Sequence, residues 1–135
     1  MSTQIREIVD QMFAAFDSRD LEGVISTFSE DAVLIHHGTQ VMPSAKFKGK
    51  DGARMFFDYN FNAMKVGYFN KNEYFESGNT LFVLGNEHFI FNSDGSEVKN
   101  RWIQIYTVEN GLISKMEEFA SSATPQQYGG NAGGL

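Results

Sequence analysis

Four side chains able to move or stabilise a proton fall on segments with a strand-like pattern: His36, Glu87, Arg101 and Tyr106. Histidine exchanges protons near neutral pH, so His36 is a suitable general base if a partner orients its second ring nitrogen. Glu87 is the nearest candidate for that partner, while Arg101 or Tyr106 would stabilise developing negative charge. This combination suits proton transfer next to a carbonyl group, which requires no cofactor.

The position of His36 depends on which face of its strand is turned inward. His36 and His37 are adjacent, so their side chains point to opposite faces of a sheet. His36 shares the parity of Leu34, whereas His37 shares that of Val33 and Ile35. Each face of the strand therefore carries apolar residues next to a histidine, so periodicity alone does not decide which histidine faces the interior.

Glu87 lies within the apolar segment 81–91 and has the parity of Val83, Gly85 and Phe89. A carboxylate flanked by phenylalanine on an apolar strand face would be partly desolvated, which raises its pKa. Gly85 would leave room beside it. The alternative is a glutamate on the exposed face of the strand.

Two alternatives remain for the segment 97–109, because its residues alternate between faces. If Arg101 faces the pocket, it can pair with Glu87 or with an anionic ligand group. If the other set does, Trp102 and Tyr106 line the pocket and Tyr106 can donate to a carbonyl. Trp102 and Tyr106 could instead pack in a contact between the sheets of a dimer.

The chain has 135 residues, a formal net charge of −6 and a pI near 4.9. This charge argues against nucleic acid or an acidic membrane as a partner. The absence of cysteine excludes disulfides and thiolate chemistry. We expect no metal, because the adjacent histidines diverge and His88 has no ligand two residues away. Without a membrane-length apolar run or a signal-peptide pattern at the N-terminus, a cytoplasmic location is the default expectation.

Helical patterns dominate the first half of the chain. Apolar residues between Ile5 and Phe16 recur every three or four positions, which predicts an amphipathic helix that ends at 17–20. Asp20 is a suitable N-cap for a short helix through Phe28. Further along we expect a buried strand at 32–36, a loop or edge strand at 39–47 because of Pro43, and a third helix opened by residues 50–52.

The second half reads as β structure, with strands at 66–77, 80–92, 97–109 and 112–121. The turn signals between them include Asn110-Gly111, a strong hairpin motif. Helices followed by a meander predict one α+β domain over residues 1–121, with helices covering one face of the sheet. Residues 122–135 form a Gly-rich tail that we expect to be flexible; the alternative is a flap that closes the pocket with Tyr128.

Several motifs resemble one superfamily: Ala15-Phe16-x-x-x-Asp20-Leu-Glu-Gly23, Phe28-Ser-Glu-Asp31-Ala, Phe47-x-Gly49, and Asn110-Gly111-Leu-Ile113 leading to Glu118-Phe119. The chain is similar over residues 3–121 to the SnoaL-like and ketosteroid-isomerase-like families, whose cone-shaped α+β fold is shared with nuclear transport factor. The resemblance implies three N-terminal helices packed on a strongly curved, mostly antiparallel sheet that encloses a conical pocket. It also implies a homodimer.

The resemblance also implies positions for site residues. His36 falls where the isomerases keep their base, which favours His36 inside. Glu87 falls near a catalytic aspartate of limonene epoxide hydrolase, another enzyme with this fold. The sequence departs from these enzymes at two positions. Met12 stands in place of the isomerase's oxyanion-hole tyrosine, and Ser121 stands where cyclases and epoxide hydrolases carry an aspartate. Glu117 and Glu118 diverge, and whichever turns inward adds a second carboxylate. The expected ligand-binding residues are Met12, Phe16, Phe57, Phe61, Phe89, Trp102, Met116 and Glu118.

Two functions follow from this pattern. One is a cofactor-free isomerase, cyclase or lyase that moves a proton on a small hydrophobic carbonyl compound, with His36 as base. The other is a non-catalytic ligand-binding or dimerisation module, which the missing tyrosine and aspartates of the isomerase and hydrolase sites favour.

Overall fold

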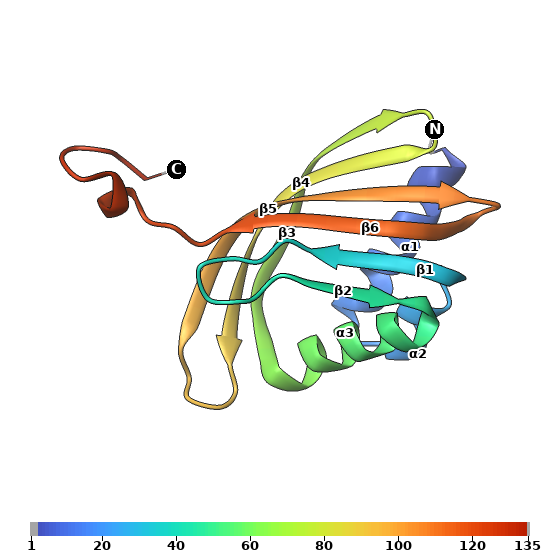
Figure 1. Cartoon of the computed structure of the whole chain (residues 1–135), viewed down its shortest axis with the longest axis horizontal. Coiled ribbons are helices and arrows are strands. Elements are labelled where there is room, and N and C mark those ends of the chain that lie inside the picture. The colour runs from blue at the N-terminus through green and yellow to red at the C-terminus, as the bar shows by residue number, and fades with distance from the viewer. Residues whose placement is uncertain (1–2, 135) are drawn as a thin grey trace.

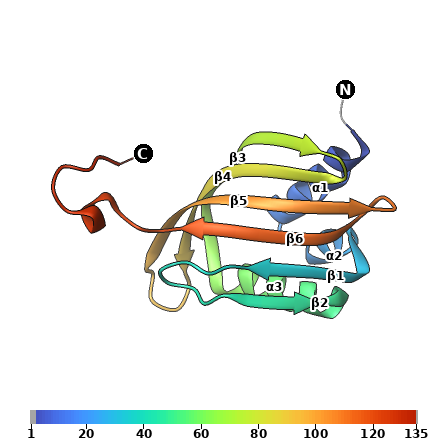
Figure 2. The ribbon, with the colours of Figure 1, turned by 45° about the horizontal axis from the view of Figure 1, so that its top comes forward.

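Three helices lie on the concave side of a curved six-stranded sheet (Figure 1; Figure 2). The computed structural model describes residues 3–134, so residues 1–2 and 135 of the expected domain and tail lie outside the described residues. The strand order is β2-β1-β6-β5-β4-β3. The predicted α+β class, with helices against one face of a mostly antiparallel sheet, is confirmed.

Helix α1 (Gln4–Asp17) is capped at its N-terminus by Thr3, whose hydroxyl accepts a hydrogen bond from the Arg6 amide at 3.1 Å. Its buried face consists of Val9, Met12, Phe13 and Phe16. These residues recur at helical spacing, so a single face of the helix packs against the sheet.

Helix α2 (Leu21–Ile25) is capped by Asp20, which accepts from the Gly23 amide at 3.0 Å. It ends at Ile25 rather than at the expected Phe28. The cause is sheet pairing, because the carbonyl of Thr27 already accepts from the Ile113 amide of β6 at 2.9 Å. Helix α3 (Gly49–Ala63) buries Ala53, Phe57 and Phe61.

Strand β1 (Phe28–His36) begins four residues before the expected Ala32 and pairs in parallel with β6 (Leu112–Ser121). Its register shifts between Phe28 and Val33, an irregularity that the apolar pattern does not reveal. Residues 39–47 include the short edge strand β2 (Ala45–Lys48), which pairs antiparallel with β1.

Strands β3 (Met64–Ser77), β4 (Thr80–Phe91) and β5 (Glu97–Glu109) complete an antiparallel meander with β6. Alternation along β5 is regular: Trp102, Gln104 and Tyr106 are buried on the concave face, and Arg101 is exposed on the other. The second of the two alternatives for this strand is therefore the observed one.

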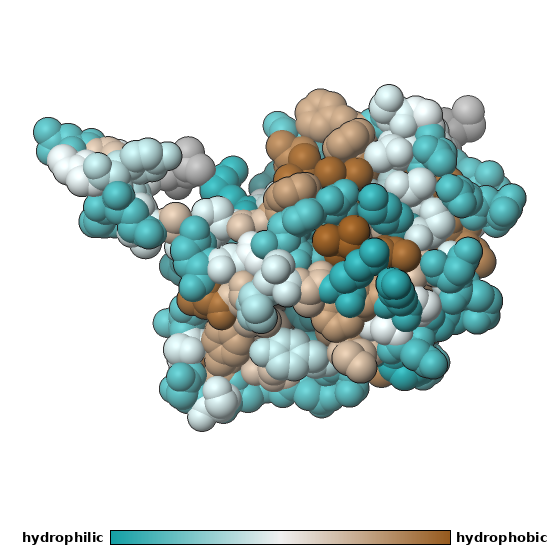
Figure 3. All heavy atoms as spheres, in the orientation of Figure 1, coloured by the Kyte–Doolittle hydropathy of each residue, from teal (hydrophilic) through white to brown (hydrophobic). Residues whose placement is uncertain are grey.

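The outer face of the sheet carries a continuous set of apolar side chains, because register partners on neighbouring strands share a face. We call this set the outer patch, and it consists of Phe75, Phe82, Leu84, Ile103, Ile105 and Phe119. Phe75 and Phe119 are 56% and 44% exposed. Figure 3 shows hydrophobic residues exposed among hydrophilic ones on this side of the molecule.

The tail leaves β6 and extends away from the sheet (Figure 1). It contains a short 3₁₀ turn (Pro125–Tyr128), which is closed by a capping box at Thr124. Tyr128 is 91% exposed, and residues 122–134 contribute nothing to the pocket lining in this arrangement. The separate flexible tail remains a prediction.

Candidate functional site

A cavity of about 600 Å³ lies between the helices and the concave face of the sheet. Side chains of α1, α3 and the loop 39–43 close it against the strands. Its lining is largely apolar, and its polar side chains include His36, Glu87, Asn100, Gln104, Tyr106 and Glu118. An apolar cavity with a few convergent polar groups is the usual form of a small-molecule site.

Three of these polar groups form one hydrogen-bonded chain, and His36 lies beside its end. The Tyr106 hydroxyl donates to Oε1 of Gln104 at 2.6 Å, and Nε2 of Gln104 donates to Oε1 of Glu118 at 2.7 Å. Nε2 of His36 lies 3.3 Å from Oε2 of Glu118. Glu118 is thus the acceptor at the meeting point of donors from β1 and β5.

The ring of His36 is engaged at both nitrogens. Its Nδ1 accepts a hydrogen bond from the Gly38 amide at 2.9 Å, so in the neutral ring the hydrogen sits on Nε2 and points to Glu118. No lone pair of the ring is left for a substrate proton. The expected role of His36 as a base therefore does not fit this geometry, and a role in orienting Glu118 does.

Glu87 and Asn100 form a second polar pair on neighbouring strands, where they are register partners. Nδ2 of Asn100 donates to Oε2 of Glu87 at 2.6 Å, and both side chains are buried. Burial, followed by the nearby charge of Glu118, raises the pKa of Glu87 to about 8, although the Asn100 hydrogen bond acts in the opposite direction. Glu87 is therefore largely a neutral acid at pH 7.

Tyr106 is fully enclosed, and its pKa is raised well above 10.0 by burial and then by the charge of Glu118. Its hydroxyl group already donates a hydrogen bond to Gln104. The expected donation from Tyr106 to a substrate carbonyl would require that bond to break. Tyr106 instead fixes the orientation of the Gln104 amide.

Three expected site residues lie elsewhere. Arg101 is on the outer face of β5 and reaches neither Glu87 nor the cavity, because alternation sends it away. Trp102 is inward but stacks on Phe69 with ring centroids 5.1 Å apart, behind the lining. Phe61 packs on Phe16 at 5.4 Å between centroids and also lies outside the lining.

The space beside Gly85 is also filled rather than open. A Cβ placed on Gly85 would stand 2.3 Å from Cζ2 of Trp102 and 2.1 Å from the carbonyl oxygen of Asn70. Glycine at this position admits the indole ring of the next strand. It does not widen the cavity beside Glu87.

The remaining expected ligand-binding residues do line the cavity: Met12, Phe16, Phe57, Phe89, Met116 and Glu118. Asn100 and Gln104 also line it and were not singled out from the sequence. Both have the parity of Tyr106, so placing Tyr106 inside would also have placed them there.

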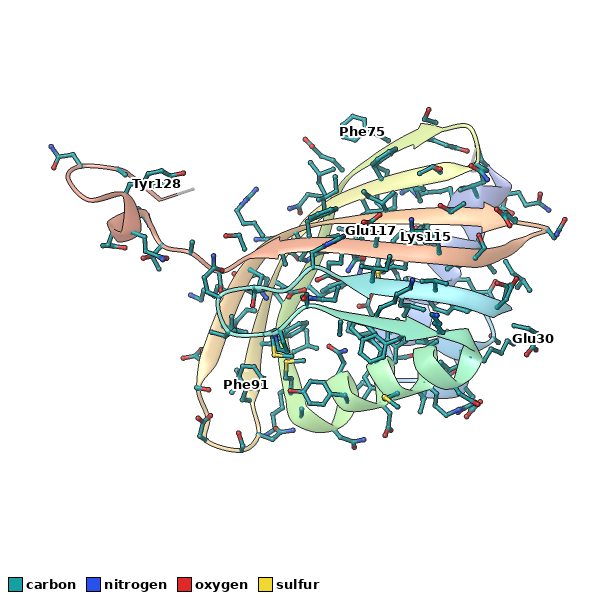
Figure 4. The ribbon with its side chains drawn as sticks, viewed as in Figure 1. Glu30, Phe75, Phe91, Lys115, Glu117 and Tyr128 are labelled. Carbon is teal, nitrogen blue, oxygen red and sulfur yellow. The ribbon has the colours of Figure 1, made fainter. Side chains whose placement is uncertain are left out.

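His37 confirms the division between the two faces. It lies outside the cavity, with Nε2 2.6 Å from Oε2 of Glu117 and its ring stacked on Phe119 at 3.9 Å. Figure 4 shows Glu117 and Lys115 together on β6, and their charged groups are 3.7 Å apart. Of the two adjacent glutamates, Glu118 is the one that faces inward.

Residues 3–134 contain neither a cluster of metal-ligating side chains nor a membrane-spanning helix. No group of three or more His, Asp or Glu side chains there is arranged to hold a metal ion. In the same range, every helix is too short or too polar to cross a bilayer.

Solved structures share this fold at low sequence identity. An NTF2-like protein from Burkholderia xenovorans superposes with a TM-score of 0.78 at 20% identity, covering 90% of this chain and 93% of that one. A Mycobacterium tuberculosis protein crystallised with estradiol-17β-hemisuccinate gives 0.76 at 22% identity, covering 87% and 94%. A ketosteroid-isomerase-like protein from Catenulispora acidiphila, in complex with trimethylamine, gives 0.74 at 14%, covering 93% and 95%.

At these identities the solved structures establish the fold and not the activity. The search of curated proteins found no match. The SnoaL-like domain, in contrast, matches residues 9–116, from the buried face of α1 to the inward side of β6. That span is most of the chain and includes nearly all of the cavity, and the protein belongs to the SnoaL-like domain family.

Proposed function

We propose that this protein binds a small hydrophobic carbonyl compound and moves a proton on it without a cofactor. The observation that carries the proposal is the presence of two carboxyl groups with different surroundings in one apolar cavity. Glu118 accepts a hydrogen bond from Gln104 and lies 3.3 Å from Nε2 of His36, whereas burial keeps Glu87 largely protonated at pH 7. Two carboxyl groups whose environments differ in this way suit an acid and a base.

In the proposed step, Glu118 takes a proton from the carbon next to the carbonyl group. The electron pair of that C–H bond becomes the enolate, and the neutral Glu87 donates a hydrogen bond to its oxygen. Return of the proton to another carbon gives an isomer. Attack of the enolate carbon on an electrophilic carbon of the same molecule gives a ring.

His36, Gln104 and Tyr106 act as positioning residues in this proposal. Gln104 donates a hydrogen bond to one oxygen of Glu118, Nε2 of His36 lies 3.3 Å from the other, and Tyr106 fixes the direction of the Gln104 amide. This assignment replaces the sequence-based expectation that His36 itself is the base.

The test is proton exchange on 1-tetralone in D₂O, followed by ¹H NMR at the carbon next to its carbonyl. The Glu118→Gln variant should lose exchange by about a hundredfold or more while it still binds the ketone, because a positioned base typically contributes that much. Glu117→Gln is the matched control, since Glu117 is the neighbouring glutamate on the opposite face. Equal exchange in both variants would rule out Glu118 as the base.

A second candidate function, ligand binding without chemistry, is favoured by the pairing of the cavity's polar groups. Tyr106, Gln104 and Glu118 are linked by hydrogen bonds, His36 is in contact with Glu118, and Asn100 donates to Glu87. The steroid ester bound by the Mycobacterium tuberculosis neighbour supports a hydrophobic ligand class under either function. Wild-type protein that binds 1-tetralone without exchanging its protons would support this second candidate.

We further propose that the protein forms a homodimer through the outer patch. The sequence offers two sets for such a contact: Trp102 with Tyr106, or Phe82 with Leu84 and Ile90. Trp102 and Tyr106 are buried on the opposite face and are not available, whereas Phe82 and Leu84 belong to the outer patch. The half-buried Ile103 and Ile105, together with the exposed Phe119, supply the apolar centre instead. A cytoplasmic location and independence from cofactors likewise remain predictions.

A further inference from the structure

The polar groups of the cavity are not equally satisfied. Asn100 is 7% exposed, and its Oδ1 has no hydrogen-bond partner. Burying an amide oxygen without a partner is unfavourable, because the oxygen loses its hydrogen bonds to water and gains none, so such an atom in a cavity wall calls for an explanation. The other half of the same amide is used, because Nδ2 donates to Glu87.

On Glu87, too, only one of the two carboxyl oxygens takes part in a hydrogen bond among the described residues. Its Oε2 accepts from Asn100, and its Oε1 is in no hydrogen bond among the described residues. Since Glu87 and Asn100 are register partners on β4 and β5, their two unused oxygens belong to directly adjacent positions of the cavity wall. Protonated Glu87 offers an O–H at this place, and Asn100 offers a lone pair beside it.

The pattern does not depend on which way the amide is turned. With the amide reversed, protonated Glu87 donates to Oδ1, and the free groups become the Asn100 N–H and the second oxygen of Glu87. In both arrangements the pair offers one donor and one acceptor side by side. A lone ketone oxygen satisfies only the donor.

We propose that Glu87 and Asn100 together form a specificity subsite for a ligand that carries a hydroxyl group next to its carbonyl group. The ligand carbonyl accepts from Glu87, and its hydroxyl donates to Asn100. α-Hydroxy ketones and the enol forms of 1,2-dicarbonyl compounds have this pattern. The inference rests on the proposed function and narrows its substrate class from carbonyl compounds in general.

On the sheet side of the cavity, the other polar side chains are already engaged by one another or by the backbone. Gln104 uses both halves of its amide, and His36 uses both ring nitrogens. These side chains have no unused site for a second polar group of a ligand. Asn100, in contrast, lies beside the proposed acid and is half used.

The experiment compares four bicyclic probes of one carbon skeleton: tetralin, 1-tetralol, 1-tetralone and 2-hydroxy-1-tetralone. Dissociation constants are measured by titration calorimetry at pH 6.5, where Glu87 is protonated. The hydroxy ketone should bind about tenfold more tightly than the ketone, because it fills an otherwise unpaired buried acceptor. This ratio of the two dissociation constants is measured on the wild-type protein alone.

The Asn100→Ala variant should reduce this ratio to about one while ketone binding is largely kept. Asn86→Ala is the matched control, since Asn86 is an asparagine on the outer side of β4 that pairs with Asn72. Asn100→Ser serves the same purpose if the alanine variant does not fold.

Equal binding of the ketone and the hydroxy ketone by the wild-type protein would overturn the subsite. So would an unchanged ratio in a folded Asn100 variant. In both cases proton exchange on 1-tetralone would still be present, and the proposed function would stand. If none of the four probes binds, the subsite and the hydrophobic carbonyl site both fail.

Discussion

At the residue scale, the chemistry of the site depends on the surroundings of two glutamates rather than on a histidine. Glu118 meets donors on both oxygens, and Glu87 is enclosed by apolar groups with one amide contact. The sequence identified Glu87 and its desolvation from its phenylalanine neighbours. The sequence placed His36 on the cavity side of its strand, but it could not show that the Gly38 amide donates a hydrogen bond to Nδ1 of His36.

The protonation of Glu87 predicts how proton exchange depends on pH. Exchange on 1-tetralone should decline as the pH rises through about 8, because Glu87 then loses the proton that it offers to the enolate. The groups that face Glu87 are the amide of Asn100 and the charge of Glu118, with His36 beyond Glu118. Exchange rates between pH 6 and 10 would measure this.

Glu87→Gln keeps a donor but cannot ionise. Its rate should be lower than that of the wild-type protein and should no longer decline through this pH range. A decline of the same size in the variant would assign the effect to another group. Asn86→Ala, on the outer face of the same strand, should behave as the wild-type protein does.

At the element scale, the contact between β4 and β5 sets the shape of the cavity wall. Gly85→Ala would place a methyl group within 2.3 Å of Trp102 and closer still to the backbone of β3. We expect the free energy of unfolding to fall by about 1–3 kcal/mol, since overpacking a core costs that much. Urea denaturation measures it.

Gly133→Ala provides the control, because nothing lies within 4 Å of that position in the tail. Its effect should remain within about 0.5 kcal/mol. An equally small effect of Gly85→Ala would mean that β3 and Trp102 move apart easily, contrary to the tight packing described above.

The outer patch predicts self-association. Replacing Ile103 by lysine places a charge in its centre and should convert a dimer to a monomer at micromolar concentration. Sedimentation velocity measures the change. Val41→Lys is the control, because Val41 is also an exposed apolar residue, at 57%, but lies in the loop by the cavity. A wild-type monomer at that concentration would contradict the proposal.

Element boundaries show what a sequence pattern can and cannot supply. The strands β5 and β6 match their expected bounds, because turn residues and alternation mark both ends. The start of β1 was missed, since its polar residues Ser29 to Asp31 lie on an irregular, exposed stretch of the strand. Which face of β5 is inward was undecidable, because both of its faces carry apolar residues.

At the scale of the whole molecule, the enclosed acid links stability to pH. In the unfolded chain Glu87 ionises near 4.5, but in the folded protein only near about 8. Between these values the unfolded state binds fewer protons, so the free energy of unfolding falls as the pH rises, at most by about 1.4 kcal/mol per pH unit from this group.

The Glu87→Gln variant should therefore be less sensitive to this change. Its midpoint of thermal unfolding should exceed that of the wild-type protein at pH 8.5, and the difference should shrink toward pH 5. Differential scanning calorimetry at the two pH values would measure both. A constant difference across this range would show that Glu87 titrates alike in the folded and unfolded chains.

A contact between Gln40 and Ser122 joins the tail to the loop that lines the cavity. Loop residues Thr39, Val41 and Met42 line the cavity, and between them Oε1 of Gln40 accepts hydrogen bonds from the amide and the hydroxyl of Ser122, at 2.7 and 2.9 Å. Ser122 is the first residue after β6. A purification tag or a fusion partner attached at the C-terminus would thus act on a loop that lines the ligand cavity. Tags for binding studies of this protein belong at its N-terminus.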